Sequence, residues 1–330
     1  MPRAAVGSRC AGREAASWCV RVMRAGAPLR WFALLIGALA PAAHAVEADY
    51  VGEKVCITCH ALEDRHFSAT QHAKVFRLNP RTAQEARGCE ACHGPGSRHI
   101  GNVTDRTALI GFTRAWNTPL ERQNAQCLAC HEGGPRIDWP GSAHALHQVA
   151  CADCHNPMAR LSVSGLQRAA TISETCLACH AQQRAEFRRR SHMPLPEGQM
   201  SCSDCHNPHG TNTRPLLRAE SINALCFACH AEKRGPFLWE HAPVRERCTH
   251  CHHPHGSNHD KLLVAARPYL CQQCHNTPIG HSGVFYRADQ TAAAAARGAT
   301  QSARVIGRSC SNCHTQIHGS NHPSGARLQR

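Results

Sequence analysis

The longest apolar stretch of the chain covers residues 31–40, near the N-terminus. Arginines precede it, and Ala43-His44-Ala45 follows it with the A-x-A pattern of a cleavage site. A membrane-spanning helix needs about 20 apolar residues, so this stretch is too short to be one. The pattern predicts a signal peptide over residues 1–45 and an exported mature chain. Met23 is a second candidate for the start of translation.

The rest of the chain, residues 46–330, has no second long apolar stretch and no sustained alternation of apolar and polar positions. Local helix signals are present but short. Thr171-Ile172-Ser173-Glu174 has the form of a capping box, and Ser221 is placed to start a similar helix. We therefore expect a fold of loops and short helices with little strand.

The composition changes this picture because a core of side chains alone would be thin. Only 16 of the 330 residues are Phe, Trp or Tyr. The unusual residues are instead the 22 cysteines and 26 histidines. These numbers indicate that something other than protein fills the interior.

All 20 cysteines of the mature chain fall into ten copies of Cys-x-x-Cys-His, which we number in chain order. This is the signature of c-type haem attachment, in which two thiols form thioethers to one porphyrin. The cysteines predicted to hold haem are Cys56, Cys59, Cys89, Cys92, Cys127, Cys130, Cys151, Cys154, Cys176, Cys179, Cys202, Cys205, Cys226, Cys229, Cys248, Cys251, Cys271, Cys274, Cys310 and Cys313.

The histidine of each motif is the predicted proximal ligand of one haem iron. These are His60, His93, His131, His155, His180, His206, His230, His252, His275 and His314. Two alternatives use the same cysteines: paired zinc sites, and a disulfide scaffold in an exported protein. Neither explains why a histidine follows every second cysteine. The sequence thus predicts ten c-type haems.

Fifteen further histidines are available as second axial ligands, which low-spin haems require. Position near the motifs selects ten distal candidates: His72, His99, His144, His192, His209, His241, His255, His281, His318 and His322. Met158 is an alternate, because it stands after motif four where parallel repeats have histidine. We favour an interpretation in which Met158 only packs, and His147 or another residue binds the fourth iron.

The middle of the chain repeats. Cys151-Ala-Asp-Cys-His-Asn-Pro is followed 51 residues later by Cys202-Ser-Asp-Cys-His-Asn-Pro. Motifs start 22 to 39 residues apart, which leaves room only for short helices and loops between haems. These repeats predict a linear stack of haem-bearing units, each in contact mainly with its neighbours.

The positive charge does not predict nucleic-acid binding. The formal net charge is +14, of which residues 1–45 contribute +5. The remaining basic residues are scattered along the chain, and ten haems bring twenty propionates for them to screen. We expect no nucleic-acid partner.

Together these features resemble the MtrA/MtoA/DmsE family of decahaem cytochromes. The resemblance rests on the ten motifs, on the segments Leu238–Val244 and Cys271–His275, and on the tail Gly307–Gly325. It implies two five-haem halves in tandem, residues 46–190 and 191–330, with bis-histidine haems. Met158 departs from that ligand pattern.

The resemblance also implies a location and partners. Members of this family act in the periplasm, associated with the outer membrane through a porin-like β-barrel. They exchange electrons with periplasmic carriers on one side and an extracellular multihaem cytochrome or terminal reductase on the other. A chain with exposed loops and propionates needs such a barrel in order to cross hydrocarbon.

Four functions fit these observations to different degrees. We favour an electron carrier, not an enzyme, in an outer-membrane conduit for extracellular metal reduction or Fe(II) oxidation. The alternative is a dedicated electron donor to an outer-surface terminal reductase. A catalytic multihaem reductase requires an open iron position, which the ten terminal histidines disfavour. A periplasmic electron store is the fourth hypothesis.

Overall fold

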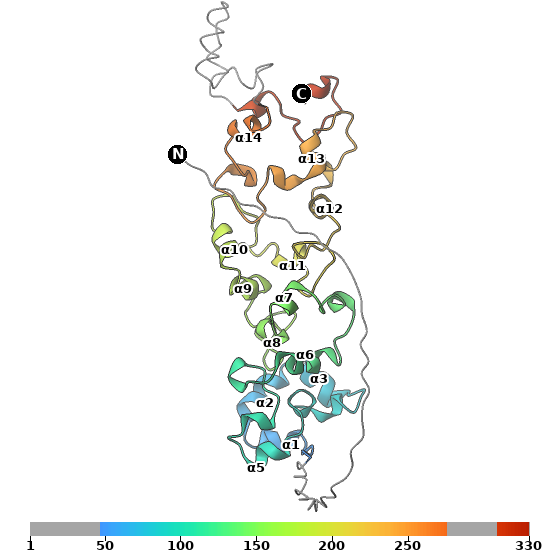
Figure 1. The fold of residues 1–330 in the computed structure, drawn as a ribbon, viewed down its shortest axis with the longest axis vertical. Coiled ribbons are helices and arrows are strands. Elements are labelled where there is room, and N and C mark those ends of the chain that lie inside the picture. The colour runs from blue at the N-terminus through green and yellow to red at the C-terminus, as the bar shows by residue number, and fades with distance from the viewer. Residues whose placement is uncertain (1–46, 276–308, 330) are drawn as a thin grey trace, which may run out of the picture. The chain divides into compact units, whose positions relative to one another are not determined.

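The computed structural model describes residues 47–275 and 309–329. The predicted signal peptide lies outside these residues. Within them the backbone forms short helices joined by loops, and residues pair as in strands only at isolated bridges (Figure 1). The longest helix, α6, has nine residues. The expected fold of loops and short helices is confirmed.

The odd-numbered motifs share one local structure. In each of them the first cysteine lies in the last turn of a short helix. These helices are α1 (Glu53–Ile57), α6 (Leu120–Leu128), α9 (Ile172–Leu177), α12 (Ile222–Phe227) and α14 (Tyr269–Gln272). The predicted helix starts are confirmed, since the side chains of Thr171 and Ser221 accept hydrogen bonds from the N–H groups of Glu174 and Ala224.

The even-numbered motifs have a different structure, in which the motif itself forms a single turn. These turns are α4 (Glu90–His93), α8 (Cys151–Cys154), α11 (Cys202–Cys205), η6 (Cys248–His250) and η8 (Cys310–Asn312), where η marks a 3-10 helix. After motifs four, six and eight, a loop returns to the proximal histidine and forms a bridge with it, His155 to Gln167, His206 to Leu217 and His252 to Leu263.

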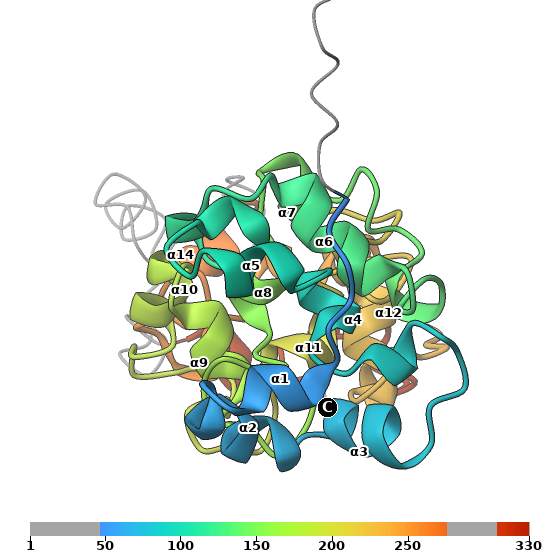
Figure 2. The ribbon, with the colours of Figure 1, turned by 90° about the horizontal axis from the view of Figure 1, so that it is seen from below.

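The remaining elements connect the motifs. The α-helices are α2 (Ala61–Ser68), α3 (Gln71–Leu78), α5 (Ser97–Gly101), α7 (Ala143–Leu146), α10 (Ala181–Glu186) and α13 (Ala242–Glu246). The 3-10 helices are η1 (Glu85–Arg87), η2 (Arg106–Ala108), η3 (Arg114–Trp116), η4 (Gly134–Arg136), η5 (Ala231–Lys233), η7 (Asp260–Leu262) and η9 (Gly325–Arg327). α6 contacts both α4 and α8, so motifs two, three and four are adjacent (Figure 2).

The protein core is sparse. Among the described residues, the buried apolar side chains are Phe67, Ala73, Ala91, Ile110, Trp139, Ala150, Phe187, Leu217, Leu263 and Leu328. Three of these are alanines, and the ten are spread along the whole chain instead of forming one cluster. A chain of this length normally buries much more apolar surface, so the short helices depend on a bound group for their packing.

The buried carboxylate of Glu90, inside motif two, holds the first described segment of the chain in place. It is 3% exposed and accepts N–H hydrogen bonds from Val51, Gly52 and Gly96 at 2.8–2.9 Å. Beside it, Arg77 pairs with Glu53 and Asp64, and these carboxylates raise the pKa of the guanidinium. Segments far apart in sequence are thereby joined by charge-assisted hydrogen bonds.

Replacing Glu90 by alanine is expected to leave three N–H groups without their acceptor. The free energy of unfolding of the haem-loaded protein should fall by about 1–3 kcal/mol or more. Urea denaturation checks this, and Glu121→Ala, at an exposed position, is the matched control. Equal stability of the two variants would contradict the role given to Glu90.

Candidate haem-binding sites

All twenty motif cysteines lie in the described residues, and none of them forms a disulfide. They lie close to cysteines of other motifs, however. The thiols of Cys127 and Cys151, in motifs three and four, lie near enough to shift each other's pKa, upward at Cys127 and downward at Cys151. The two cysteines belong to α6 and α8, which contact each other. With haem attached, these sulfur atoms are the thioether links to the porphyrin edge.

The same pairing of thiols recurs along the chain. The first cysteine of each odd motif lies near the first cysteine of the even motif that follows it. The pairs are Cys56–Cys89, Cys127–Cys151, Cys176–Cys202, Cys226–Cys248 and Cys271–Cys310. The pKa of Cys271 is raised to about 11, mainly by burial and next by the neighbouring Cys310. Each odd motif is thus paired with the even motif that follows it.

A second set of neighbours joins each even motif to the next odd one, now through the second cysteines. The pairs are Cys92–Cys130, Cys154–Cys179, Cys205–Cys229 and Cys251–Cys274. Burial raises the pKa of Cys92 to about 11, and the neighbouring Cys130 contributes to this rise. The two sets together connect all ten motifs in chain order, without a gap and without a branch.

The proximal histidines of the even motifs are held by the backbone. In each, Nδ1 lies 2.6–2.9 Å from a backbone carbonyl oxygen, which accepts a hydrogen bond from the Nδ1–H group. The pairs are His93–Ile110, His155–Gly165, His206–Pro215, His252–Lys261 and His314–Arg327. Such a bond fixes the tautomer and the ring orientation and leaves Nε2 free to bind a metal ion. This is the arrangement that an axial ligand requires.

Seven of the ten predicted distal histidines face a proximal histidine across a gap. Their ring centroids are 5.8–6.3 Å apart in the pairs His60–His99, His131–His72, His180–His144, His155–His209, His206–His255, His275–His241 and His252–His318. An imidazole nitrogen lies about 2 Å from a metal ion that it binds. Two imidazoles on opposite faces of one iron therefore have centroids about 6 Å apart, so these residues fit a haem.

Burial lowers the pKa of eight of the motif and distal-candidate imidazoles and so favours the neutral form that binds metal. Desolvation is the largest cause of a lowered pKa at His72, His93, His131, His180, His209, His241, His255 and His318. At neutral pH each of these rings consequently retains a lone pair for iron.

Three distal candidates are not placed against a proximal histidine in the described residues. His192 interacts with Glu197 at 3.1 Å, and Nδ1 of the exposed His322 accepts the N–H of Ser324. His281 lies outside the described residues. Correspondingly His93, His230 and His314 have no imidazole partner among the described ring contacts. The assignment of distal ligands to these three motifs stays a prediction.

The histidine of the fourth motif faces an imidazole that sequence position did not assign to it. His209 faces His155, with ring centroids 6.0 Å apart and ring planes only 11° from parallel. His147, which we considered for this iron, is exposed on the end of α7. Met158 follows motif four in sequence, but the imidazole that faces His155 lies in the loop after motif six.

A buried carboxylate lies beside the distal candidate of motif six. Glu186, at the end of α10, has a side chain only 5% exposed, and its Oε2 is 3.5 Å from Nδ1 of His255. Its Oε1 accepts a hydrogen bond from Gln182 and is 3.8 Å from Nε2 of His253. A carboxylate at Nδ1 orients an imidazole ligand and increases its basicity.

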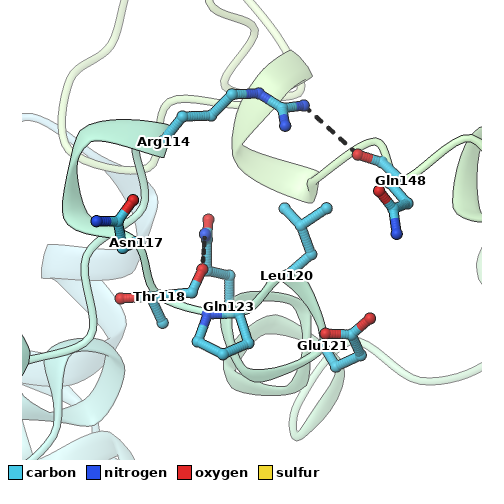
Figure 3. Close-up of a pocket in the computed structure, with 8 residues that line it drawn as sticks. Arg114, Asn117, Thr118, Leu120, Glu121, Gln123 and Gln148 are labelled. Carbon is cyan, nitrogen blue, oxygen red and sulfur yellow. Dashed lines mark hydrogen bonds between the residues drawn. The ribbon is translucent and has the colours of Figure 1, made fainter.

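A pocket of about 310 Å³ lies between the loop after motif two and α6 (Figure 3). Arg114 crosses its rim and donates to the carbonyl of Gln148, while Gln123 donates to the carbonyl of Thr118. The lining contains no histidine and no cysteine. Its hydrogen bonds join neighbouring segments, and Glu121 is the only carboxylate in its lining.

Within residues 47–275 and 309–329, none of the helices combines the length and the hydrophobicity that crossing a membrane requires.

Family models match two parts of the chain. A model described as a doubled CXXCH motif matches residues 192–235 and again 241–279. A model described as a cytochrome c-type protein of the NrfB-like kind matches residues 89–173. Both matches coincide with the haem-attachment motifs, so covalently bound c-type haem and the multihaem cytochrome fold are confirmed.

One curated relative matches most of the chain. The multihaem cytochrome MtrA of Shewanella baltica (strain OS185) is 41% identical over 279 residues, which cover 84% of this chain and 81% of the relative. The matched length includes most of the motif region.

Proposed function

Since this chain belongs to the MtrA family of multihaem cytochromes, we propose that it carries electrons between the periplasm and the cell exterior through ten c-type haems. The unbroken series of cysteine contacts carries this proposal. Each motif interacts through one cysteine with the motif before it and through the other with the motif after it. When bound, haem supplies an iron that takes up and releases one electron.

The chain's own contribution is to hold the attachment points close together. Both cysteines of a motif bond to one edge region of a porphyrin, so neighbouring sulfur atoms of two motifs would bring two porphyrin edges near each other. Two imidazoles that face each other, as at seven of the motifs, would make the iron six-coordinate, which suits electron transfer and leaves no position for a substrate. The chain therefore acts as an electron carrier and not as an enzyme.

We place the mature chain in the periplasm, in complex with an outer-membrane β-barrel. The predicted signal peptide supports export. The exposed loops and haem propionates support the barrel, since neither is compatible with hydrocarbon. An extracellular multihaem cytochrome or reductase and periplasmic carriers are the partners at the two ends. The same series of sites serves electron flow in either direction, and the donor and acceptor determine that direction.

Vesicles that contain the barrel partner test this proposal. The haem-loaded chain is purified with the barrel and inserted into liposomes that enclose a reduced dye, and a ferric chelate is then added outside. We expect a stable complex and rapid oxidation of the enclosed dye. Vesicles with the barrel alone are the control. No complex, or equal oxidation without the chain, would contradict the proposed conduit.

A further inference from the structure

Unlike motifs four, six and eight, the second motif has no histidine opposite its proximal ligand among the described ring contacts. His93 is oriented in the usual way, with Nδ1 2.9 Å from the carbonyl oxygen of Ile110. Its ring contact among the described residues is Phe112, edge-on at 5.3 Å, and not a second imidazole. Phe112 follows Ile110 by two residues, as Gln167 follows Gly165 at the bridge after motif four, so it belongs to the loop that flanks the proximal side.

A regular relation places the distal candidates of motifs four, six and eight. The histidine facing motif four comes from the loop after motif six, in the pair His155–His209. Motif six is faced from the loop after motif eight by His255, and motif eight from the loop after motif ten by His318. Each even motif thus takes its ligand from the loop two motifs further along the chain. For motif two, that is the loop after motif four.

The loop after motif four holds Met158 as the loop after motif six holds His209. The N–H of Met158 donates to Oδ1 of Asn156 at 3.1 Å, and the N–H of His209 donates to Oδ1 of Asn207 at 3.2 Å. Both asparagines also donate their own N–H to the carbonyl of a leucine in the returning strand of the loop. The backbone therefore presents the methionine side chain in the same way as the histidine.

From this correspondence we propose that Met158 is the distal ligand of the second haem, which has His93 and the Met158 thioether on opposite faces of its iron. This inference rests on the proposed haem loading. It goes beyond the bis-histidine pattern, and it transfers Met158 from the fourth haem, where its sequence position had pointed, to the second.

The residue after the ligand supports a methionine at this place. Gly210, after His209, has φ +122°, and a Cβ there would lie 2.3 Å from the carbonyl oxygen of Asp138. Ala159 carries such a Cβ, so this loop cannot approach its neighbour as closely as the loop after motif six. A methionine side chain is longer and more adaptable than an imidazole ring, and it can span the wider gap. The competing histidines His66 and His147 are exposed, whereas Met158 is half-buried.

A thioether ligand raises the reduction potential of a c-type haem relative to a second imidazole. The second haem then has the highest potential in a series of otherwise bis-histidine sites. It is the second haem from the N-terminal end. An electron that enters at that end would stay longer on this high-potential haem before it moves to the next. The chain thus contains a built-in high-potential step.

Absorption spectroscopy of the fully loaded, oxidised protein tests the ligand. We expect a weak methionine-to-iron charge-transfer band near the red end of the spectrum. Met158→His should abolish the band, keep the protein low-spin and lower its highest reduction potential. Met158→Ala should instead make one haem high-spin. Met200→Ala is the matched control and should leave both the band and the spin state unchanged.

Loss of the second haem identifies which iron carries the band. The variant Cys89→Ala/Cys92→Ala should lack both one haem and the band. Ten haems by mass with no band, or a band that survives Met158→His, would overturn the ligand assignment and leave the proposed function intact. Far fewer than ten haems would instead contradict the proposed function itself.

Discussion

Alanine substitution of Cys176 and Cys179 is expected to remove the fifth haem and stop most electron flow between the two ends of the chain. The reason lies in the order of contacts. Cys176 interacts with Cys202 in motif six, and Cys179 interacts with Cys154 in motif four. No contact between motifs four and six bypasses this position in the described cysteine pairs. Electrons would need to cross the width of a missing porphyrin.

The measurement combines intact mass with dye oxidation in vesicles. The mass should show nine haems, and the rate of dye oxidation should collapse. The matched control is Cys310→Ala/Cys313→Ala, which also removes one haem but at the end of the series. It should retain a continuous path through the remaining nine. Undiminished flow in the motif-five variant, with nine haems confirmed, would show that the haems do not form a single series.

Replacing His209 by alanine is expected to convert one haem, the fourth, from low-spin to high-spin. His209 is the described imidazole that faces His155, so its removal opens an iron position. The pKa of His209 is lowered mainly by burial, so the wild-type ring is neutral and available to iron. About a tenth of the iron should become high-spin and bind carbon monoxide on reduction.

Electron paramagnetic resonance of the oxidised protein measures the spin state. His250→Ala removes an exposed histidine that has no ring partner and should change nothing. His209→Met should restore a low-spin iron, with a potential higher than in the wild type. A fully low-spin His209→Ala protein would mean that another residue binds the fourth iron.

The attachment sites were predictable from sequence because their chemistry is local. A porphyrin needs two thiols and an imidazole within five consecutive residues, so the motif appears as an uninterrupted pattern. Helix starts at Thr171 and Ser221 were predictable for the same reason, since a capping side chain bonds to an N–H three residues later. The sparse core followed from the small number of aromatic side chains.

The pairing of ligands was not predictable in this way, because it depends on contacts between distant segments. Nothing in the neighbourhood of His155 indicates that its partner comes from beyond motif five. Met158 was accordingly considered for the haem nearest in sequence. The signal that was available is the repeat itself: Asn-Pro after motifs four and six, against Ala-led helices α2 and α10 after motifs one and five. That alternation marks two kinds of unit, and only the fold shows that motifs four, six and eight are each faced by a histidine from the loop after the next even motif.

Each of ten covalently attached haems should have an axial ligand on both faces of its iron. Intact mass spectrometry of the mature chain, produced with a haem-ligation system, tests it most directly when combined with the spin state of the same sample. We predict a mass equal to the polypeptide plus ten porphyrins, with essentially all iron low-spin. A mass with markedly fewer porphyrins, or a largely high-spin sample, would contradict the account.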